Sequence, residues 1–172
     1  MAGLPPAVRC AVRAGQELSL DRIVIAGADE AFMRKWSFQL RAAGVPTLGD
    51  KIGPSALDAT MPLLALDSQS FPDEGGLRDF AAGAGRLDAR RVIAGRPAAA
   101  LRWKPGPFGA GTNSLSYVLD KALSEPAAEI EAGVFFDARG EAAARTAEIL
   151  YARLVKDTDG YIARLDRTLS IA

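Results

Sequence analysis

The sequence contains no histidine and only one cysteine, Cys10, among its 172 residues. A zinc site built from histidine and cysteine therefore has almost no ligands, histidine-based catalysis is excluded, and no disulfide can form within the chain. The 21 basic residues balance the 21 acidic residues, so the formal net charge is zero. This balance does not indicate a nucleic-acid partner, and we expect none.

Long apolar runs are also missing. The longest, such as residues 61–66, are far too short to span a bilayer. The first 15 residues lack a charged segment followed by an apolar one, so they do not have the pattern of a signal peptide. We therefore expect a cytoplasmic protein. Its length and its 49% hydrophobic content are sufficient for one domain with a buried core.

Short apolar segments alternate with amphipathic ones along most of the chain. The pattern predicts strands at 22–27, 45–48, 62–66, 91–94, 98–103 and 130–136. It predicts helices at 7–16, 29–43, 72–82, 113–124 and 140–156, with Asp29 and Asn113 as N-caps and Gly44 as a stop signal. Strands that alternate with helices indicate an α/β fold of three layers, with a mainly parallel sheet covered by helices on both faces.

Two acidic residues follow apolar strands. Asp67 comes after the segment PLLAL, and Asp137 comes after AGVFF. Ligands of open α/β sheets bind beyond the carboxyl ends of strands, so we expect both carboxylates at one cleft. Carboxylate oxygens suit Mg²⁺, and the pair is our candidate magnesium site. The alternative is that each aspartate only ends its strand or caps the next turn.

The last residues of the chain, 154–171, read LVKDTDGYIARLDRTLSI. This segment resembles the junction between a cytosolic nucleotidyltransferase-like domain and a membrane-embedded CDP-alcohol phosphotransferase domain in two-part phospholipid-synthesis proteins. The resemblance divides the chain into an α/β domain, 1–156, and a basic juxtamembrane-type tail, 157–172. The tail resembles part of the phosphotransferase catalytic motif at Asp159–Gly160, but Lys156 replaces the first aspartate, so we assign no lipid-transfer catalysis to it.

Other segments resemble the same nucleotidyltransferase family, which has a Rossmann-like fold. Two segments resemble the family's acidic motifs. The first motif is matched in degenerate form by LALDSQSF, and the second motif with its following helix is matched by VFFDARGEAAARTAEILYARLVK. Residues 3–44 resemble the first helix, second strand and second helix. The resemblance implies that Asp67 and Asp137 bind Mg²⁺ together with a CTP- or CDP-type nucleotide.

The family's Gly-rich phosphate loop has no counterpart ahead of the first predicted helix. We therefore expect a sheet that lacks one central strand, or one in which another segment takes that place. The loop 104–112, KPGPFGAGT, contains Lys104 and three glycines, so Lys104 is a further candidate nucleotide-binding residue. The segment does not have the spacing of a Walker A loop, and a surface loop over the cleft is the alternative.

Three functions remain open. The first is a degenerate nucleotidyltransferase-like domain with a binding or regulatory role in CDP-alcohol phospholipid synthesis. The second is an active, Mg²⁺-dependent CTP:phospho-alcohol cytidylyltransferase, and the third is an unrelated α/β binding or oligomerisation module. The tail predicts a short amphipathic basic helix that contacts the inner membrane surface or a membrane domain. It also fits packing on its own domain or on a second copy, as a homodimer would require.

Overall fold

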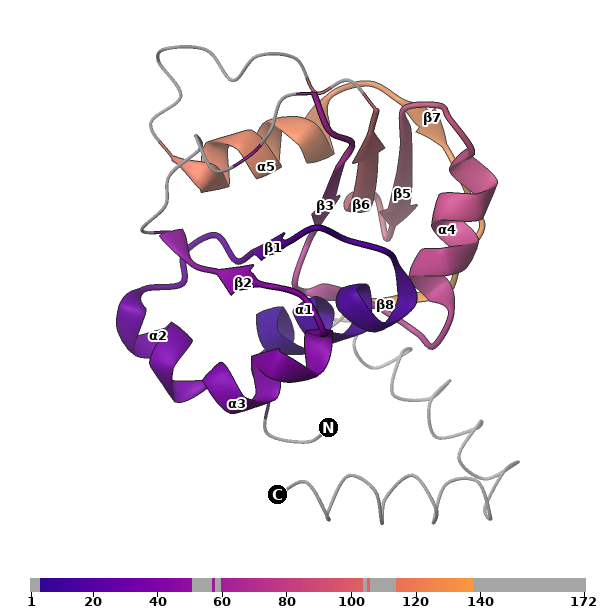
Figure 1. Cartoon of the computed structure of the whole chain (residues 1–172). Helices are drawn as coiled ribbons and strands as arrows, with labels where there is room; N and C mark the ends of the chain where they lie inside the picture. Colours follow the sequence, from indigo (N-terminus) through magenta and orange to yellow (C-terminus); the bar gives the residue numbers. More distant parts are fainter. Residues whose placement is uncertain (1–3, 51–56, 58–59, 104, 106–113, 138–172) are drawn as a thin grey trace, which may run out of the picture.

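The computed structural model describes residues 4–50, 57, 60–103, 105 and 114–137 (Figure 1). The helices among them are α1 (Pro6–Glu17), α2 (Glu30–Lys35), α3 (Ser37–Leu40), the 3-10 helix η1 (Arg41–Ala43), α4 (Gly76–Ala84) and α5 (Leu115–Ser124). The strands are β1 (Ile23–Val24), β2 (Thr47–Leu48), β3 (Leu63–Leu66), β4 (Ser70–Pro72), β5 (Ala89–Ile93), β6 (Arg96–Arg102), β7 (Ala128–Glu129) and β8 (Phe135–Asp137). The predicted mixture of helices and strands is confirmed.

The strands form three sheets within the described residues. The largest has the order β3-β6-β5-β7, while β1 pairs with β2 and β4 pairs with β8. Three of the five strand pairings are antiparallel, so the prediction of a mainly parallel sheet is wrong for this part of the chain. In the four-stranded sheet the reversed strand is β6: β3 and β5 both run against it, and β7 runs with β5. The third antiparallel pairing is that of β4 with β8.

A tight turn explains why β6 is reversed. Only Ala94 and Gly95 separate β5 from β6, and both have positive φ angles, 50° and 75°. This conformation matches the right-handed twist of a hairpin, and a connection this short can join only antiparallel strands. The sequence predicts the two strands with a turn at residues 95–97, whereas in the structure the turn is Ala94–Gly95 and β6 already begins at Arg96. The direction of β6 follows from the length of that turn.

Helices cover both faces of the four-stranded sheet. Leu101 of β6 belongs to the core cluster that includes Leu77 and Phe80 of α4. The neighbouring Arg102 instead bonds to carbonyl groups at the end of α5. Because successive side chains of a strand point to opposite faces, α4 and α5 lie on opposite sides of β6. The covering of both faces, as predicted, is present around this strand.

The N-terminal third forms a smaller unit around the β1–β2 pair. Asp29 caps α2 as predicted, because its carboxylate accepts a hydrogen bond of 2.7 Å from the N–H of Phe32. The predicted single helix over 29–43 is divided into α2, α3 and η1, with Trp36 at φ −104° and ψ 9° between the first two. Gly44 ends this region at φ 73°, where a glycine is favoured.

Some predictions for the C-terminal part need correction. The N-cap of α5 is Ser114, whose hydroxyl accepts a hydrogen bond from the N–H of Tyr117, and not Asn113. The strand predicted at 130–136 is replaced by β7 and β8. The predicted helix 140–156 and the tail 157–172 lie outside the described residues. None of the described helices is long and apolar enough to cross a membrane.

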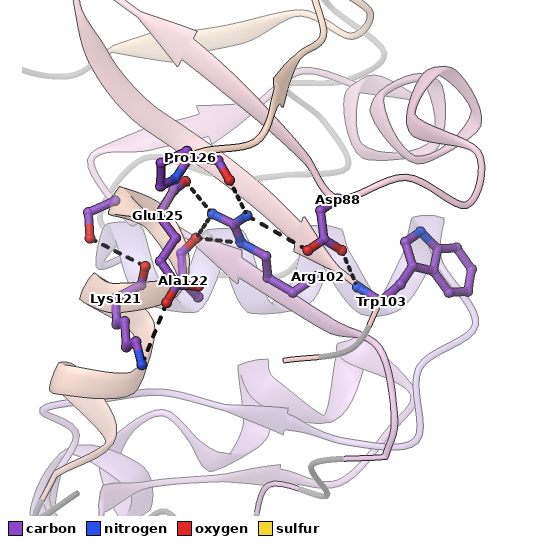
Figure 2. A network of polar contacts seen from close by, with 8 residues as sticks. Asp88, Arg102, Trp103, Lys121, Ala122, Glu125 and Pro126 are labelled. Carbon is purple, nitrogen blue, oxygen red and sulfur yellow. Dashed lines mark hydrogen bonds and ion pairs between the residues drawn. The ribbon is translucent and has the colours of Figure 1, made fainter. Parts of the chain in front are cut away.

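Arg102 joins β6 to the end of α5 and to β5 (Figure 2). Its guanidinium donates hydrogen bonds to the carbonyl oxygens of Ala122 (2.6 and 2.9 Å), Glu125 (2.6 Å) and Pro126 (3.2 Å). It also lies 4.0 Å from the carboxylate of Asp88. The side chain is only 3% exposed. Carbonyl groups at a helix C-terminus have no partners within the helix, so a cation that binds them stabilises the helix end.

Glu17 makes the equivalent contact at the start of α4. Its carboxylate accepts hydrogen bonds from the N–H groups of Gly75 (2.9 Å), Leu77 (2.9 Å) and Arg78 (3.4 Å). The N-cap residue of α4 is Gly75, which has no side chain to bind these groups. Glu17 at the end of α1 therefore caps a helix that lies about sixty residues away in the sequence, and it joins α1 to the four-stranded sheet.

We expect Arg102→Ala to lower the free energy of unfolding by about 3 kcal/mol, because the substitution leaves several carbonyl groups without a hydrogen-bond donor. Arg102→Lys should recover less than half of this loss, since an ammonium group cannot reach the same set of carbonyls in a planar fork. Urea denaturation followed by circular dichroism measures both effects. Lys121→Ala is the matched control, because Lys121 makes an exposed ion pair with Glu125. A change below about 0.5 kcal/mol is expected there.

Candidate functional site

Asp67 stands in a tight turn between β3 and β4. Its N–H donates to the carbonyl of Ala98 in β6 at 2.9 Å, so the residue continues the ladder by one position. Its carboxylate accepts a hydrogen bond from the N–H of Gln69 at 3.0 Å, and its carbonyl accepts one from the N–H of Ser70 at 2.9 Å. The sequence analysis correctly places Asp67 at the end of a strand. The alternative interpretation, that Asp67 caps the next turn, is also met, because its carboxylate accepts the hydrogen bond from the N–H of Gln69. The two interpretations, strand end and turn cap, are compatible.

Asp137 ends β8 and lies directly opposite Ser70 of β4 in the antiparallel ladder. Asp137 is 4% exposed and Ser70 is fully buried. Ser70 therefore bonds to the backbone of Asp67 on one side and pairs with Asp137 on the other. The structure brings the two predicted acids to the same corner of the fold through Ser70. We call this group of three residues the acidic corner.

The two carboxylates of the acidic corner are the candidate ligands for a metal ion. Among the described residues, no group of three or more histidine, cysteine, aspartate or glutamate side chains is placed to hold a metal. Mg²⁺ commonly binds one or two carboxylates and takes its remaining oxygen ligands from water and from substrate phosphates. Asp67 and Asp137 thus fit the protein's share of a nucleotide-linked Mg²⁺ site better than a site enclosed by protein ligands alone.

Residues of α1 border the acidic corner. The thiol of Cys10 donates a weak hydrogen bond of 3.9 Å to the carbonyl of Ser68, the residue after Asp67. Burial raises the pKa of Cys10 to about 12, while the charge of Arg9 acts to lower this pKa and that of Asp67 to raise it. Both charges therefore lie close enough to act on the thiol. The sequence analysis missed Arg9 and Cys10, because nothing in the helix 7–16 indicates which strand end it meets.

A large cavity extends from Asp67 between the four-stranded sheet and the β1–β2 sheet. Its volume is about 1210 Å³. Its walls come from α1, residues 18–26 including β1, residues 61–64 and 66–68 around β3, and one side of α5. Of the two predicted acids, only Asp67 is among its lining residues. We expected both carboxylates at one cleft. Asp67 lines this cavity, whereas Asp137 is paired with Ser70 in the β4–β8 ladder and is not among the lining residues.

Lys104 is the remaining candidate nucleotide-binding residue. Lys104 lies outside the described residues. Trp103 beside it packs against the core of the four-stranded sheet, and its backbone N–H donates to the carboxylate of Asp88 at 2.8 Å (Figure 2). Gly27 precedes the cap of α2, and its N–H donates to the carboxylate of Asp50 at 2.9 Å. These contacts agree with a tight turn and a helix cap at residues 27–30.

Comparison with known proteins gives no match. No protein-family model matches the chain, and neither a curated protein nor a solved structure is similar to it at a significant level.

Cys10 should behave as a buried, protonated thiol. Because the thiolate is the reactive form, we expect the native chain to react with a soluble disulfide reagent at pH 8 at least about 100-fold more slowly than the urea-unfolded chain. The rate of release of the coloured thiol product measures this difference. Equal rates in the native and unfolded chains would show that the thiol is accessible and ionised, and would contradict the burial of α1 against residue 68.

The same pKa shift predicts how stability depends on pH. The unfolded thiol ionises near pH 9.0 and the folded thiol near pH 12. The folded state therefore keeps its proton when the unfolded state loses it, and the contribution is complete below pH 9 and is lost as the pH rises toward 12. Between pH 9 and 10.5 the wild type should lose up to about 1 kcal/mol per pH unit more than Cys10→Ala. Parallel slopes in urea denaturation would contradict the shift.

Proposed function

We propose that this chain is a degenerate nucleotidyltransferase-like domain linked to CDP-alcohol phospholipid synthesis. In this proposal it binds a CTP- or CDP-type nucleotide with Mg²⁺ and acts as a binding or regulatory module. The observation that carries the proposal is the position of Asp67 and Asp137 on the two sides of Ser70. These acids are distant in sequence, and each follows a strand, as the resemblance requires.

The arrangement of the strands also supports this proposal. Strands β3, β5 and β7 run in one direction, and helices cover both faces of the sheet at β6. The parallel β1–β2 pair forms a separate sheet in the described part of the chain. A Rossmann-like sheet that lacks one central strand would divide in this way. We therefore retain the three-layer, Rossmann-like nucleotidyltransferase fold as part of the proposal.

The lack of catalysis is inferred from the phosphate-binding groups. Nucleotidyl transfer depends on holding phosphates in place and neutralising their charge. No segment of the printed sequence matches the family's Gly-rich loop. Arg9 is a basic residue whose charge acts on Cys10, the neighbour of Ser68 beside the acidic corner. One cation can assist phosphate binding, but it does not replace a loop of backbone N–H groups together with a lysine.

Membrane contact and dimer formation remain proposals that rest on sequence. The basic tail, 157–172, would place the domain at the inner face of the membrane, next to the site of phospholipid synthesis. A homodimer would bring two tails to the same surface. Both ideas concern residues outside the described part of the chain.

Calorimetric titration with CDP and CTP, with and without Mg²⁺, tests the proposed site. We expect Mg²⁺-dependent binding that weakens at least about tenfold in Asp67→Asn and in Asp137→Asn, because each substitution removes a charged oxygen ligand while keeping the side-chain shape. Glu74→Gln is the matched control, since Glu74 is an exposed carboxylate between β4 and α4. Circular dichroism of each variant checks that the fold is intact.

Two results would contradict this proposal. Pyrophosphate release from CTP with a phospho-alcohol and Mg²⁺ would identify the chain as an active cytidylyltransferase. The absence of nucleotide binding at millimolar concentration would favour the third possibility, an α/β module whose function is unrelated to nucleotides.

A further inference from the structure

β3 is an edge strand of the four-stranded sheet in the described part of the chain. The N–H of Asp67 bonds to Ala98 of β6, and the ladder continues with Ala65 opposite Ala100. Backbone groups in an antiparallel ladder alternate in direction, so those of Leu64 and Leu66 point away from β6. Both residues line the cavity. The cavity therefore contains a row of backbone donors and acceptors on one wall.

The opposite wall is formed by the smaller sheet. The N–H groups of Ile23 and Ile25 bond to Pro46 and Leu48, so the backbone of Val24 between them points away from β2. Val24 also lines the cavity. Strand edges with open hydrogen-bonding groups are sites at which another strand can pair. The cavity lies between two such edges, which a pocket for a small apolar ligand would not require.

The other two walls are helices: α1 contributes apolar residues, and α5 contributes leucines together with Ser116, Asp120 and Ser124. Ala11 and Ala14 of α1 line one side, and Leu115 and Leu119 of α5 line another. A strand that is covered on both faces needs apolar side chains at successive positions and not an alternating pattern. The cavity volume of about 1210 Å³ exceeds the usual range for small-molecule pockets, about 300–1,000 Å³. The space therefore suits an extended peptide with a continuous apolar run.

The charges in the lining agree with this occupant. They stand at the ends of elements or on exposed positions, and comprise Asp21, Arg22, Asp67, Arg96 and Asp120. Three of these five charged residues are acidic and two are basic. An apolar segment with a basic residue at each end complements this distribution.

We propose that the cavity is a docking site for an extended apolar segment of a partner protein, which adds to β3 as a further strand and fills the space toward β1. This is recognition by strand addition, in which main-chain hydrogen bonds provide affinity and the apolar walls select the side chains. The strand pairing does not require nucleotide binding, since it uses the backbone of Leu64 and Leu66, although Asp67 of the acidic corner also lines the cavity.

Amide hydrogen exchange tests this proposal in the ¹⁵N-labelled full chain. The probe is the synthetic peptide acetyl-Lys-Val-Ile-Val-Ile-Val-Lys-amide. Saturating peptide should slow exchange at Leu64 and Leu66 at least about tenfold, because both N–H groups become hydrogen-bonded. Exchange at Ala65 should change much less, since its N–H already faces β6. Binding without protection at Leu64 and Leu66 would show that the cavity takes the probe only as an apolar ligand, and would overturn the proposal.

Two control peptides carry N-methyl groups on alternate residues, one on the odd and one on the even positions. They keep the side chains but remove the N–H donors along one edge of the strand. At least one of them should bind at least about tenfold more weakly than the parent peptide. Unchanged binding by both would show that backbone pairing plays no part. Competition by a fatty acid without any amide protection would identify an acyl-chain site instead and would also overturn the proposal.

A pair of protein variants tests the same edge from the other side. Leu64→Pro removes the N–H that faces the cavity, and proline is tolerated at such positions of edge strands. Leu64→Ala removes the side chain and keeps the N–H. Peptide affinity should fall at least about tenfold further in Leu64→Pro than in Leu64→Ala. Equal affinity in two folded variants would contradict strand addition. The exchange experiment on the wild type remains decisive where Leu64→Pro fails to fold.

Discussion

The buried guanidinium of Arg102 determines how α5 is placed, and much of the candidate site depends on that placement. Arg102 ends the central strand β6 and binds carbonyls of Ala122, Glu125 and Pro126 at the end of α5. A charge with 3% exposure is tolerated only when such partners surround it. Since α5 supplies one wall of the cavity, the contact of Arg102 with the C-terminal end of this helix helps to hold that wall in place.

The sequence predicted most elements of the fold but not the direction of every strand. Apolar patterns identify β3 and β6 because their side chains are buried, and Asp29 and Gly44 mark helix ends by local chemistry. The run from Ala98 to Leu101 is apolar at every position, which is expected for a parallel strand covered on both faces. The same pattern arises in a reversed strand with helices on both faces. Only the short turn at Ala94–Gly95 distinguishes them.

The acidic corner was predictable in part for the same reason. Asp67 follows a strand whose apolar pattern is clear, so the neighbouring residues alone predict that Asp67 stands at the end of this strand. The pairing of Ser70 with Asp137 joins residues that are far apart in sequence, and β4 is too short to give a periodic signal. Cys10 and Glu17 also act over long range, at Ser68 and at Gly75. Such contacts depend on how α1 packs, which no local pattern contains.

In the described part of the chain β1 and β3 have open edges, and these edges give one physical explanation for both the proposed function and the proposed docking site. A sheet missing a central strand would lose its phosphate loop, which weakens nucleotidyl transfer, and would leave a cavity flanked by unpaired strand edges. Unpaired edges beside apolar walls are unfavourable in water and promote association with other strands. A domain that has lost catalysis in this way would therefore gain a surface for a partner strand. Loss of the original activity and a role in binding would then have the same structural cause.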